Sequence, residues 1–159
     1  MPITSVANLK INLKHKERLL CLDLGRKTIG LAISDISCTI ATPLCTIIRT
    51  KFKEDVKKLF TIIDLRYVNG LIVGLPVNMN GIEGSSCQSV RQFVTNLLNF
   101  RELHIAFWDE RLSTIAVTRT LLEADVSRLR RHKVIDKIAA TYIMQGALDY
   151  IQAVTNSSI

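Results

Sequence analysis

Acidic residues stand at an end of an apolar segment at three well-separated places in the chain, and they are the residues best suited to chemistry. Asp23 ends one strand-like run, Asp109 and Glu110 end another, and Asp136 begins an apolar helical pattern. An isolated ionised carboxylate is costly to remove from water, so each needs a partner. Carboxylate oxygens suit Mg²⁺, and two such ions ~3.5–4 Å apart can drive hydrolysis of a phosphodiester. The pattern predicts metal-assisted hydrolysis, provided that the fold brings these acids together.

Each acid also has a purely structural explanation. Asp23 can accept hydrogen bonds from the amides of the turn that follows it. Side-chain alternation sends Asp109 and Glu110 to opposite faces, so at most one of them joins Asp23, and Arg111 is a ready ion-pair partner worth ~0–1 kcal/mol. Asp136 in a first helical turn stabilises the helix dipole. The spacing alone leaves both explanations open.

Basic residues supply the second chemical signal. The 159 residues include 21 Lys and Arg against 14 Asp and Glu, a formal net charge of +7, which attracts polyanions such as nucleic acid. A basic stretch lies just before Asp136, where arginine forks and lysine ammoniums can neutralise backbone phosphates. The candidate nucleic-acid-binding residues are Lys27, Asn78, Asn80, Arg111, Arg128, Arg130, Arg131, Lys133 and Lys137.

The elements that must position these residues follow from hydrophobic periodicity. Strand-like runs cover 19–24, 29–35, 44–49, 71–75 and 104–108, and helical patterns cover 53–67, 86–98, 113–124 and 134–151. Three consecutive strands favour an antiparallel meander, and the later alternation of helix and strand favours parallel pairing. We therefore expect one α/β domain over 19–151 with a mixed sheet. We expect 1–18 to be a poorly ordered basic arm and 152–159 to be a C-terminal tail.

Cysteine spacing and hydropathy bear on the compartment. The four cysteines are 17, 7 and 42 positions apart, which matches no zinc or redox motif and favours reduced, mostly buried thiols. No segment approaches the ~20 apolar residues that span a bilayer, and polar residues interrupt the first 18 positions. We expect a cytoplasmic protein with no membrane partner.

Four sequence blocks carry a family resemblance. The blocks LDLGRKTIGLAISD (22–35), VGLPVNMNG (73–81), DERLST (109–114) and VIDKIAA (134–140) occur in this order. Together they resemble the YqgF/RuvX family, bacterial Holliday-junction-resolvase-like proteins assigned as nucleases that mature pre-16S rRNA. The resemblance covers 19 to about 150.

The resemblance implies an RNase H-like fold, a five-stranded mixed sheet in the order 3-2-1-4-5 flanked by helices. Carried over by motif, the metal-binding acids are Asp23, Glu110 or Asp109, and Asp136, and they imply one or two Mg²⁺ or Mn²⁺ ions. We take Asp23, Glu110 and Asp136 as the catalytic residues. The chain departs from the family in two places. Ile135 stands between Val134 and Asp136, where the family commonly has Val-Asp-Lys without an intervening residue. The segment before 19 is longer than is usual in the family.

The expected function is that of a hydrolase acting on phosphodiester bonds. On this reading the protein is a metal-dependent endonuclease that processes the 5′ end of pre-16S rRNA in ribosome biogenesis, with structured RNA and ribosome assembly particles as partners. One alternative is a Holliday junction resolvase acting on branched DNA. Another is a non-catalytic RNA-binding factor for ribosome assembly. An actin-like ATPase is disfavoured because that architecture needs two such domains. Oligomeric state is left open.

Overall fold

The structure is a computed structural model that describes residues 3–113 and 128–157. For 128–134 and 136 it describes the helical backbone and not the side chains. The helix expected over 113–124 therefore lies, apart from its first residue, outside the described residues.

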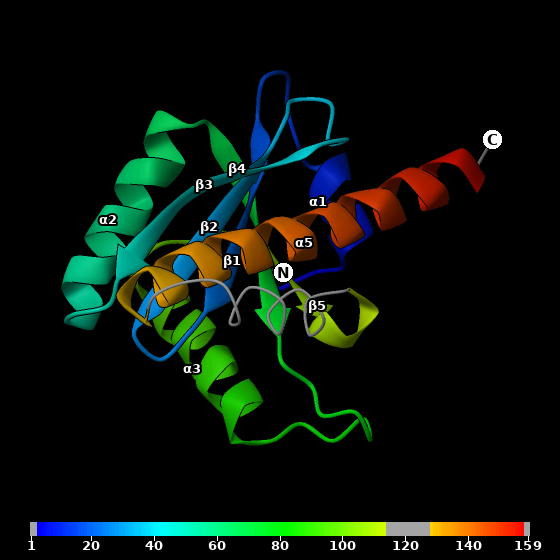
Figure 1. The fold of residues 1–159 in the computed structure, drawn as a ribbon. Helices are drawn as coiled ribbons and strands as arrows, with labels where there is room; N and C mark the ends of the chain where they lie inside the picture. Colours follow the sequence, from blue (N-terminus) through cyan, green and yellow to red (C-terminus); the bar gives the residue numbers. More distant parts are fainter. Residues whose placement is uncertain (1–2, 114–127, 158–159) are drawn as a thin grey trace.

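A five-stranded sheet forms the centre of the molecule, in the order β3-β2-β1-β4-β5 (Figure 1). β1 pairs antiparallel with β2 and parallel with β4, while β2 and β3 are antiparallel and β4 and β5 parallel. The expected mixed sheet in the order 3-2-1-4-5, flanked by helices, is confirmed. The strands are β1 (Arg18–Leu24), β2 (Thr28–Ser34), β3 (Ala41–Ile48), β4 (Val68–Leu75) and β5 (Ile105–Asp109).

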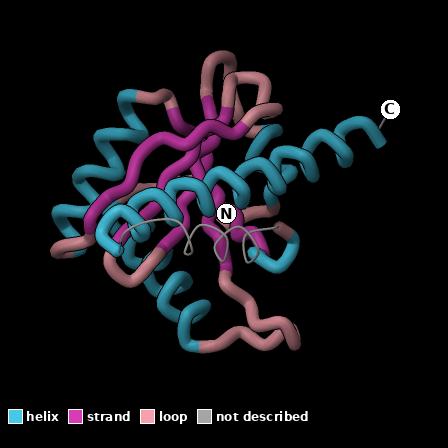
Figure 2. Tube along the Cα trace, in the orientation of Figure 1, coloured by secondary structure: helices cyan, strands magenta, loops and turns pink. Residues whose placement is uncertain are grey.

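Helices cover both faces of this sheet, and Figure 2 shows the strands enclosed between them. Helices α2 (Phe52–Leu65) and α3 (Ser85–Phe100) pack on one face. Helices α1 (Val6–Ile11) and α5 (Arg128–Ser157) pack on the other. A short 3₁₀ helix, η1 (Glu110–Leu112), follows β5 directly. The two apolar layers explain why β1 is buried on both sides.

Alternation along β1 divides its side chains between the two layers. Leu20 and Leu22 join the core under α2 and α3, whereas Leu19 and Cys21 join the core under α1 and α5. Asp23 continues the second series, toward α5. Because β1, β4 and β5 are parallel, their carboxyl ends meet at one edge of the sheet, which we call the carboxyl edge.

The segment before β1 differs from expectation. Instead of forming a poorly ordered arm, it contributes α1, whose Val6 and Leu9 are buried in the core under α5. Ile3 forms a parallel bridge with Ile105 at the open side of β5, and the Thr4 N–H donates to the Ile105 carbonyl at 2.8 Å. Apolar residues at 3, 6 and 9 within the basic composition make this docking favourable.

The last helix is longer than its apolar pattern indicates. The expected helix over 134–151 becomes α5, which begins at Arg128 and continues to Ser157, so most of the expected tail is helical. All four cysteines are free thiols, and three of them are buried. Among the helices that the structure describes, none has the length and apolarity to cross a membrane.

Candidate active site

Asp23 occupies a buried position at the carboxyl edge. It pairs with Gly30 of the neighbouring strand β2 and is only 3% exposed. The rows of the sheet bring it next to Gly74, since Leu22 pairs with Val73 in the preceding row. A carboxylate here is held by a rigid strand, on the α5 side of the sheet.

Glu110 approaches the same place from β5. A Cβ atom added to Gly74 would lie 2.8 Å from Glu110 Oε1 and 2.7 Å from Ile143 Cδ1 of α5. The carboxylate of Glu110 thus lies over the backbone of β4, in space that a larger residue at 74 would fill. A glycine inside a strand is typical of such a close approach.

Cys21 reports that both carboxylates share this region. Burial raises the pKa of the Cys21 thiol well above its ordinary value, and the charges of Asp23 and then Glu110 raise it further. The charges of Asp23 on β1 and of Glu110 after β5 thus both act on the pKa of this one buried thiol. The fold brings together these two residues although 87 positions separate them in the sequence.

Asp109 has a different environment. It pairs with Leu75, whose side chain belongs to the core under α2 and α3. Its carboxylate accepts hydrogen bonds from the Arg111 side chain, the shortest at 2.6 Å, and from the Arg111 backbone N–H at 2.9 Å. Side-chain hydrogen bonds from Arg111 lower the pKa of Asp109 below its ordinary value. Asp109 thus caps η1 and orients Arg111.

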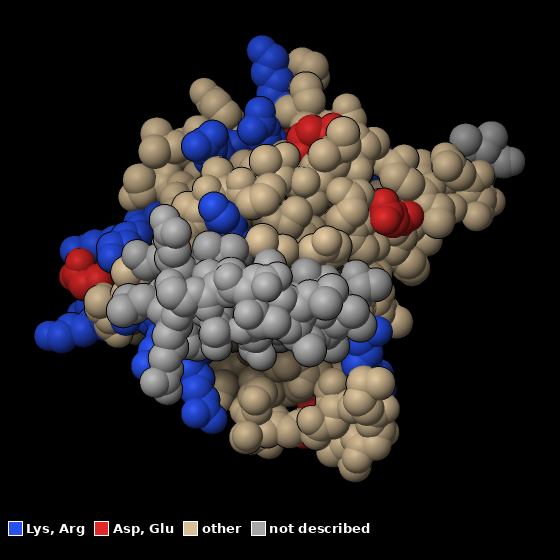
Figure 3. Space-filling model, viewed as in Figure 1, with Lys and Arg blue, Asp and Glu red and all other residues tan. Residues whose placement is uncertain are grey.

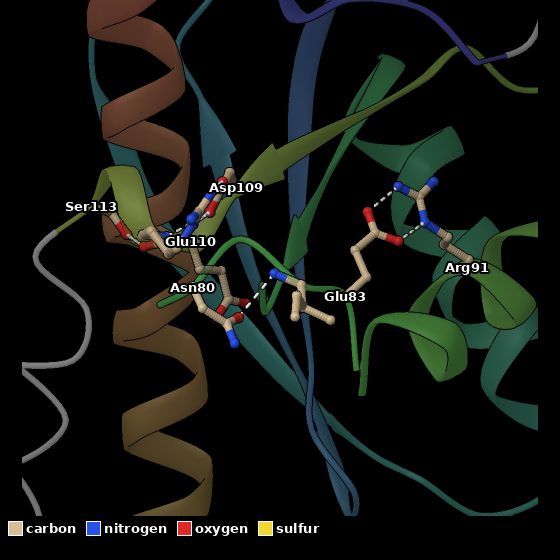
Figure 4. Close-up of polar contacts among 8 residues, drawn as sticks. Asn80, Glu83, Arg91, Asp109, Glu110 and Ser113 are labelled. Carbon is tan, nitrogen blue, oxygen red and sulfur yellow. Dashed lines mark hydrogen bonds and ion pairs between the residues drawn. The ribbon is translucent and has the colours of Figure 1, made fainter. Parts of the chain in front are cut away.

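The loop after β4 lies against this end of β5 (Figure 4). A Cβ atom on Gly81 would be 3.6 Å from a terminal nitrogen of Arg111. Asn80 Oδ1 accepts from the Ile82 N–H at 3.0 Å, and Asn78 is exposed beside it. Gly81 has a φ of +84°, so the tight turn depends on glycine. Of the expected nucleic-acid-binding residues, Asn78, Asn80 and Arg111 therefore lie together near Glu110.

The remaining candidates are placed less completely. Lys27 is exposed in the turn between β1 and β2, and Lys137 is half-buried on α5. Asp136 is in α5, but its side chain lies outside the described residues, as do those of Arg128, Arg130, Arg131 and Lys133. In Figure 3, Lys and Arg atoms border the grey region on its left and lower sides.

The donor set of Asp23 and Glu110 fits a hard divalent cation. Both offer carboxylate oxygens, and Mg²⁺ characteristically takes one or two carboxylates while keeping several waters. The absence of a side chain at Gly74 leaves room for the Glu110 carboxylate on the side of the sheet that Asp23 also faces. Within the part of the chain that the structure describes, no group of three His, Cys, Asp or Glu residues forms a metal site.

Gly74 was not singled out from the sequence. It stands inside the apolar run 71–75, and a glycine in a strand indicates close contact with another group. That signal could have identified the position, but not the fact that Glu110 is the group that approaches it.

The sequence is similar to those of known proteins over nearly its whole length. A family model described as RuvX, Holliday junction resolvase, matches residues 17–150. A protein of Paramagnetospirillum magneticum named "Putative pre-16S rRNA nuclease" is 60% identical over 149 residues, covering 94% of this chain and 96% of its own. A protein of the same name from Rhodospirillum rubrum is 52% identical over 150 residues, covering 94% and 93%.

A solved structure supports the fold. The structure described as "T. thermophilus RuvC in complex with Holliday junction substrate" aligns with a TM-score of 0.50 at 9% sequence identity, covering 89% of this chain and 97% of that one. The sheet, its helices and this likeness define the class of the protein by its fold, which is RNase H-like.

Within that class the assignment is specific. The chain belongs to the RuvX family, also called YqgF, as the four sequence blocks indicated. It is a nuclease, an enzyme that hydrolyses phosphodiester bonds.

Proposed function

We propose that this protein is a metal-dependent endonuclease that processes the 5′ end of pre-16S rRNA during ribosome biogenesis. The observation that carries the proposal is the Glu110 carboxylate over Gly74, a position that the strand register places beside buried Asp23 at the carboxyl edge of the sheet. The names of the relatives support precursor rRNA as the substrate. The basic composition fits a polyanionic partner.

Asp136 completes the proposed site. It lies four residues before Ala140 and seven before Ile143 in α5, and both of these are fully buried against the sheet. Positions with this spacing share one side of a helix. We propose that Asp136 is the third metal ligand, with Glu110 rather than Asp109 as the second, because Asp109 is engaged by Arg111.

The acidic and basic residues of the chain have different proposed roles. Asp23 and Glu110 would hold Mg²⁺ or Mn²⁺ through carboxylate oxygens, which suit these ions. When bound, such an ion would supply activation of water and stabilisation of the leaving oxygen of a phosphodiester. Arg111, fixed by Asp109, directs its guanidinium group beside the loop 78–82, where it contacts a backbone phosphate. Lys27, Lys137 and the basic residues of 128–133 extend the attraction for the nucleic-acid backbone.

The test compares cleavage and binding by single variants. Asp23→Asn and Glu110→Gln should each reduce metal-dependent cleavage of a precursor 16S rRNA fragment at least about 100-fold. Loss of a group that only supports a metal ligand already costs 10–100-fold, so loss of a ligand should cost no less. Affinity for the same RNA, measured by fluorescence anisotropy, should change little. Asp109→Asn, one residue from Glu110, tests the choice between the two acids: because Asp109 orients Arg111, cleavage should fall, but by less than about tenfold.

The outcomes separate the rival functions. Normal cleavage by Asp23→Asn would remove Asp23 from the mechanism. RNA binding without any metal-dependent cleavage by the wild-type protein would favour a non-catalytic assembly factor. The family description and the resolvase neighbour support four-way DNA junctions as the second candidate substrate. Faster cleavage of a junction than of precursor rRNA, with one metal at one concentration, would favour it.

A further inference from the structure

A concavity lies at the carboxyl edge, on the face of the sheet that α2 and α3 cover. Its volume is about 540 Å³. Four segments line it: the turn after β1, the residues after β3, Pro76 directly after β4, and the part of α3 from Ser85 to Phe93. We call it the α3 pocket. Its polar lining consists of Arg26, Arg49, Thr50, Ser85, Ser86 and Ser89, and among the residues that the structure describes no Asp or Glu belongs to the lining.

Arg49 is held in a fixed orientation in this pocket. One terminal nitrogen donates to the Gly25 carbonyl at 2.6 Å, and the guanidinium carbon lies 5.6 Å from the centre of the Phe93 ring. These contacts use one of the five N–H donors of an arginine fork and leave the charge in place. Arg26, in the turn after β1, is exposed at the same concavity. Two guanidinium groups therefore serve one cavity.

The beginning of α3 adds neutral donors. Ser85, Ser86 and Ser89 carry hydroxyl groups, and the first turn of this 16-residue helix contains no acidic residue. Its N-cap is Gly84, which makes no side-chain capping bond. Backbone N–H groups at a helix start favour an anion, and here they supplement the arginines.

The nearby acids are already engaged. Asp55 accepts from the N–H and the hydroxyl of Thr50, at 3.0 and 3.2 Å. Glu83 forms an ion pair of 2.6 Å with Arg91. Neither acid lines the cavity, so the charged residues of its described lining are Arg26 and Arg49.

We infer that the α3 pocket binds a phosphate group of the substrate's backbone, distinct from the one that is hydrolysed. The inference rests on the proposed function. Leu24, which lines the pocket, directly follows Asp23, and alternation places the two side chains on opposite faces of the sheet. A strand of nucleic acid that crosses the carboxyl edge thus meets carboxylates on one face and arginines on the other. Arginine forks and hydroxyl groups make phosphate contacts that fix register without reading sequence.

The test measures the salt dependence of binding in the Asp23→Asn background, so that the RNA stays intact. The probe is the precursor 16S rRNA fragment, followed by fluorescence anisotropy between 50 and about 300 mM KCl. Each neutralised phosphate contributes roughly 0.7 to 0.9 to the slope of log K against log salt. Arg26→Gln should lower the slope by about that amount. Arg49→Lys keeps the charge but loses the fork, so affinity should fall several-fold at an unchanged slope.

The matched control is Arg66→Gln. Arg66 is an exposed arginine that ends α2 just before β4 begins, at the opposite edge of the sheet. Its replacement should leave the slope unchanged. An equal loss of slope in Arg66→Gln and Arg26→Gln would mean diffuse attraction, and an unchanged slope in Arg26→Gln would mean no contact. Either result overturns the inference.

A second probe distinguishes a nucleic-acid phosphate from a free one. Titration with inorganic phosphate, followed by the backbone amide resonances of Ser85 and Ser86, should give weak shifts that disappear in Arg49→Gln. Strong shifts with inorganic phosphate and an unchanged RNA slope would make the pocket a free-phosphate site and overturn its assignment to RNA. Because these are binding measurements, absence of rRNA cleavage would remove the proposed function and leave their results standing.

Discussion

At the scale of single residues, the site depends on pairs of neighbours that do different work. Asp109 and Glu110 are adjacent, yet one is held by Arg111 while the other lies over Gly74 beside Asp23. Alternation along a strand predicted that only one of them would join Asp23. It could not predict which, because the sequence does not show which face of β5 lies on the Asp23 side; in the structure Trp108 is in the core under α5, so Asp109 is on the other face.

Asp35 allows a prediction about pH. Burial alone would raise the pKa of its carboxyl group, but hydrogen bonds from the Ile40 and Thr39 N–H groups and the Thr39 hydroxyl outweigh it and lower the pKa. A lowered folded-state pKa gives stability above the unfolded pKa of about 3.9, and this stability is lost as pH falls through the folded value. Asp35→Asn should therefore destabilise the protein at pH 7.

The measurement for Asp35→Asn is urea unfolding at several pH values. The difference in free energy of unfolding between wild type and variant should be largest near pH 7 and should shrink below about pH 4. A difference that stays constant from pH 7 to pH 3 would show that the charge of Asp35 contributes nothing to stability.

At the scale of elements, the apolar runs were reliable because burial on both faces leaves a clear sequence pattern. β1 and β4 were predicted to within a few residues for this reason. β3 begins earlier than expected, at Ala41, since an edge strand tolerates Pro43. The sequence pattern missed the start of α5 at Arg128, because the basic first turns of this helix carry no apolar stripe. Arg, Leu and Lys are nevertheless good helix formers. Pairing with β2 sets the start of β3, and a single-sequence pattern does not contain that pairing.

Two glycines give a matched prediction about packing between elements. A Cβ atom on Gly74 would lie 2.7 Å from Ile143 Cδ1 and 2.8 Å from Glu110 Oε1, whereas one on Gly146 would lie 3.5 Å from the Trp108 ring. Gly74→Ala should lower the free energy of unfolding by about 1–3 kcal/mol. It should also reduce cleavage, because the Glu110 side chain must move. Gly146→Ala, inside α5, should gain about 0.5–1 kcal/mol through helix propensity.

Thermal and urea unfolding of both glycine variants, with cleavage rates, tests this pair. Equal stability changes in the two variants would contradict the argument from space. Full activity in Gly74→Ala would show that the position of Glu110 does not depend on the gap.

At the scale of the whole molecule, two apolar layers enclose the sheet, and the chain's beginning helps to close one of them. Leu9 is 1% exposed, and its side chain would be 3.4 Å from a Cβ atom on Gly70 of β4. Composition concealed this role, because the segment is basic overall and its apolar residues Ile3, Val6 and Leu9 occur only about once per turn.

The contribution of α1 can be measured with two nearby substitutions. Leu9→Ala should lower the free energy of unfolding by about 2–5 kcal/mol, the range for a buried leucine. Ile11→Ala, at a position 77% exposed, should change it by less than about 0.5 kcal/mol. The comparison uses urea denaturation midpoints at constant slope. A small effect of Leu9→Ala would mean that α1 is a dispensable attachment.

Trp108 is the chain's single tryptophan, and it stands two residues before Glu110 on β5. Its indole ring is 8% exposed, packs against Gly146 of α5 and lies 5.8 Å from the ring of Tyr150. Detachment of α5 from the sheet would expose this ring to water. The protein thus contains its own fluorophore at the contact between the last helix and the last strand, where emission reports the docking of α5 without any added label.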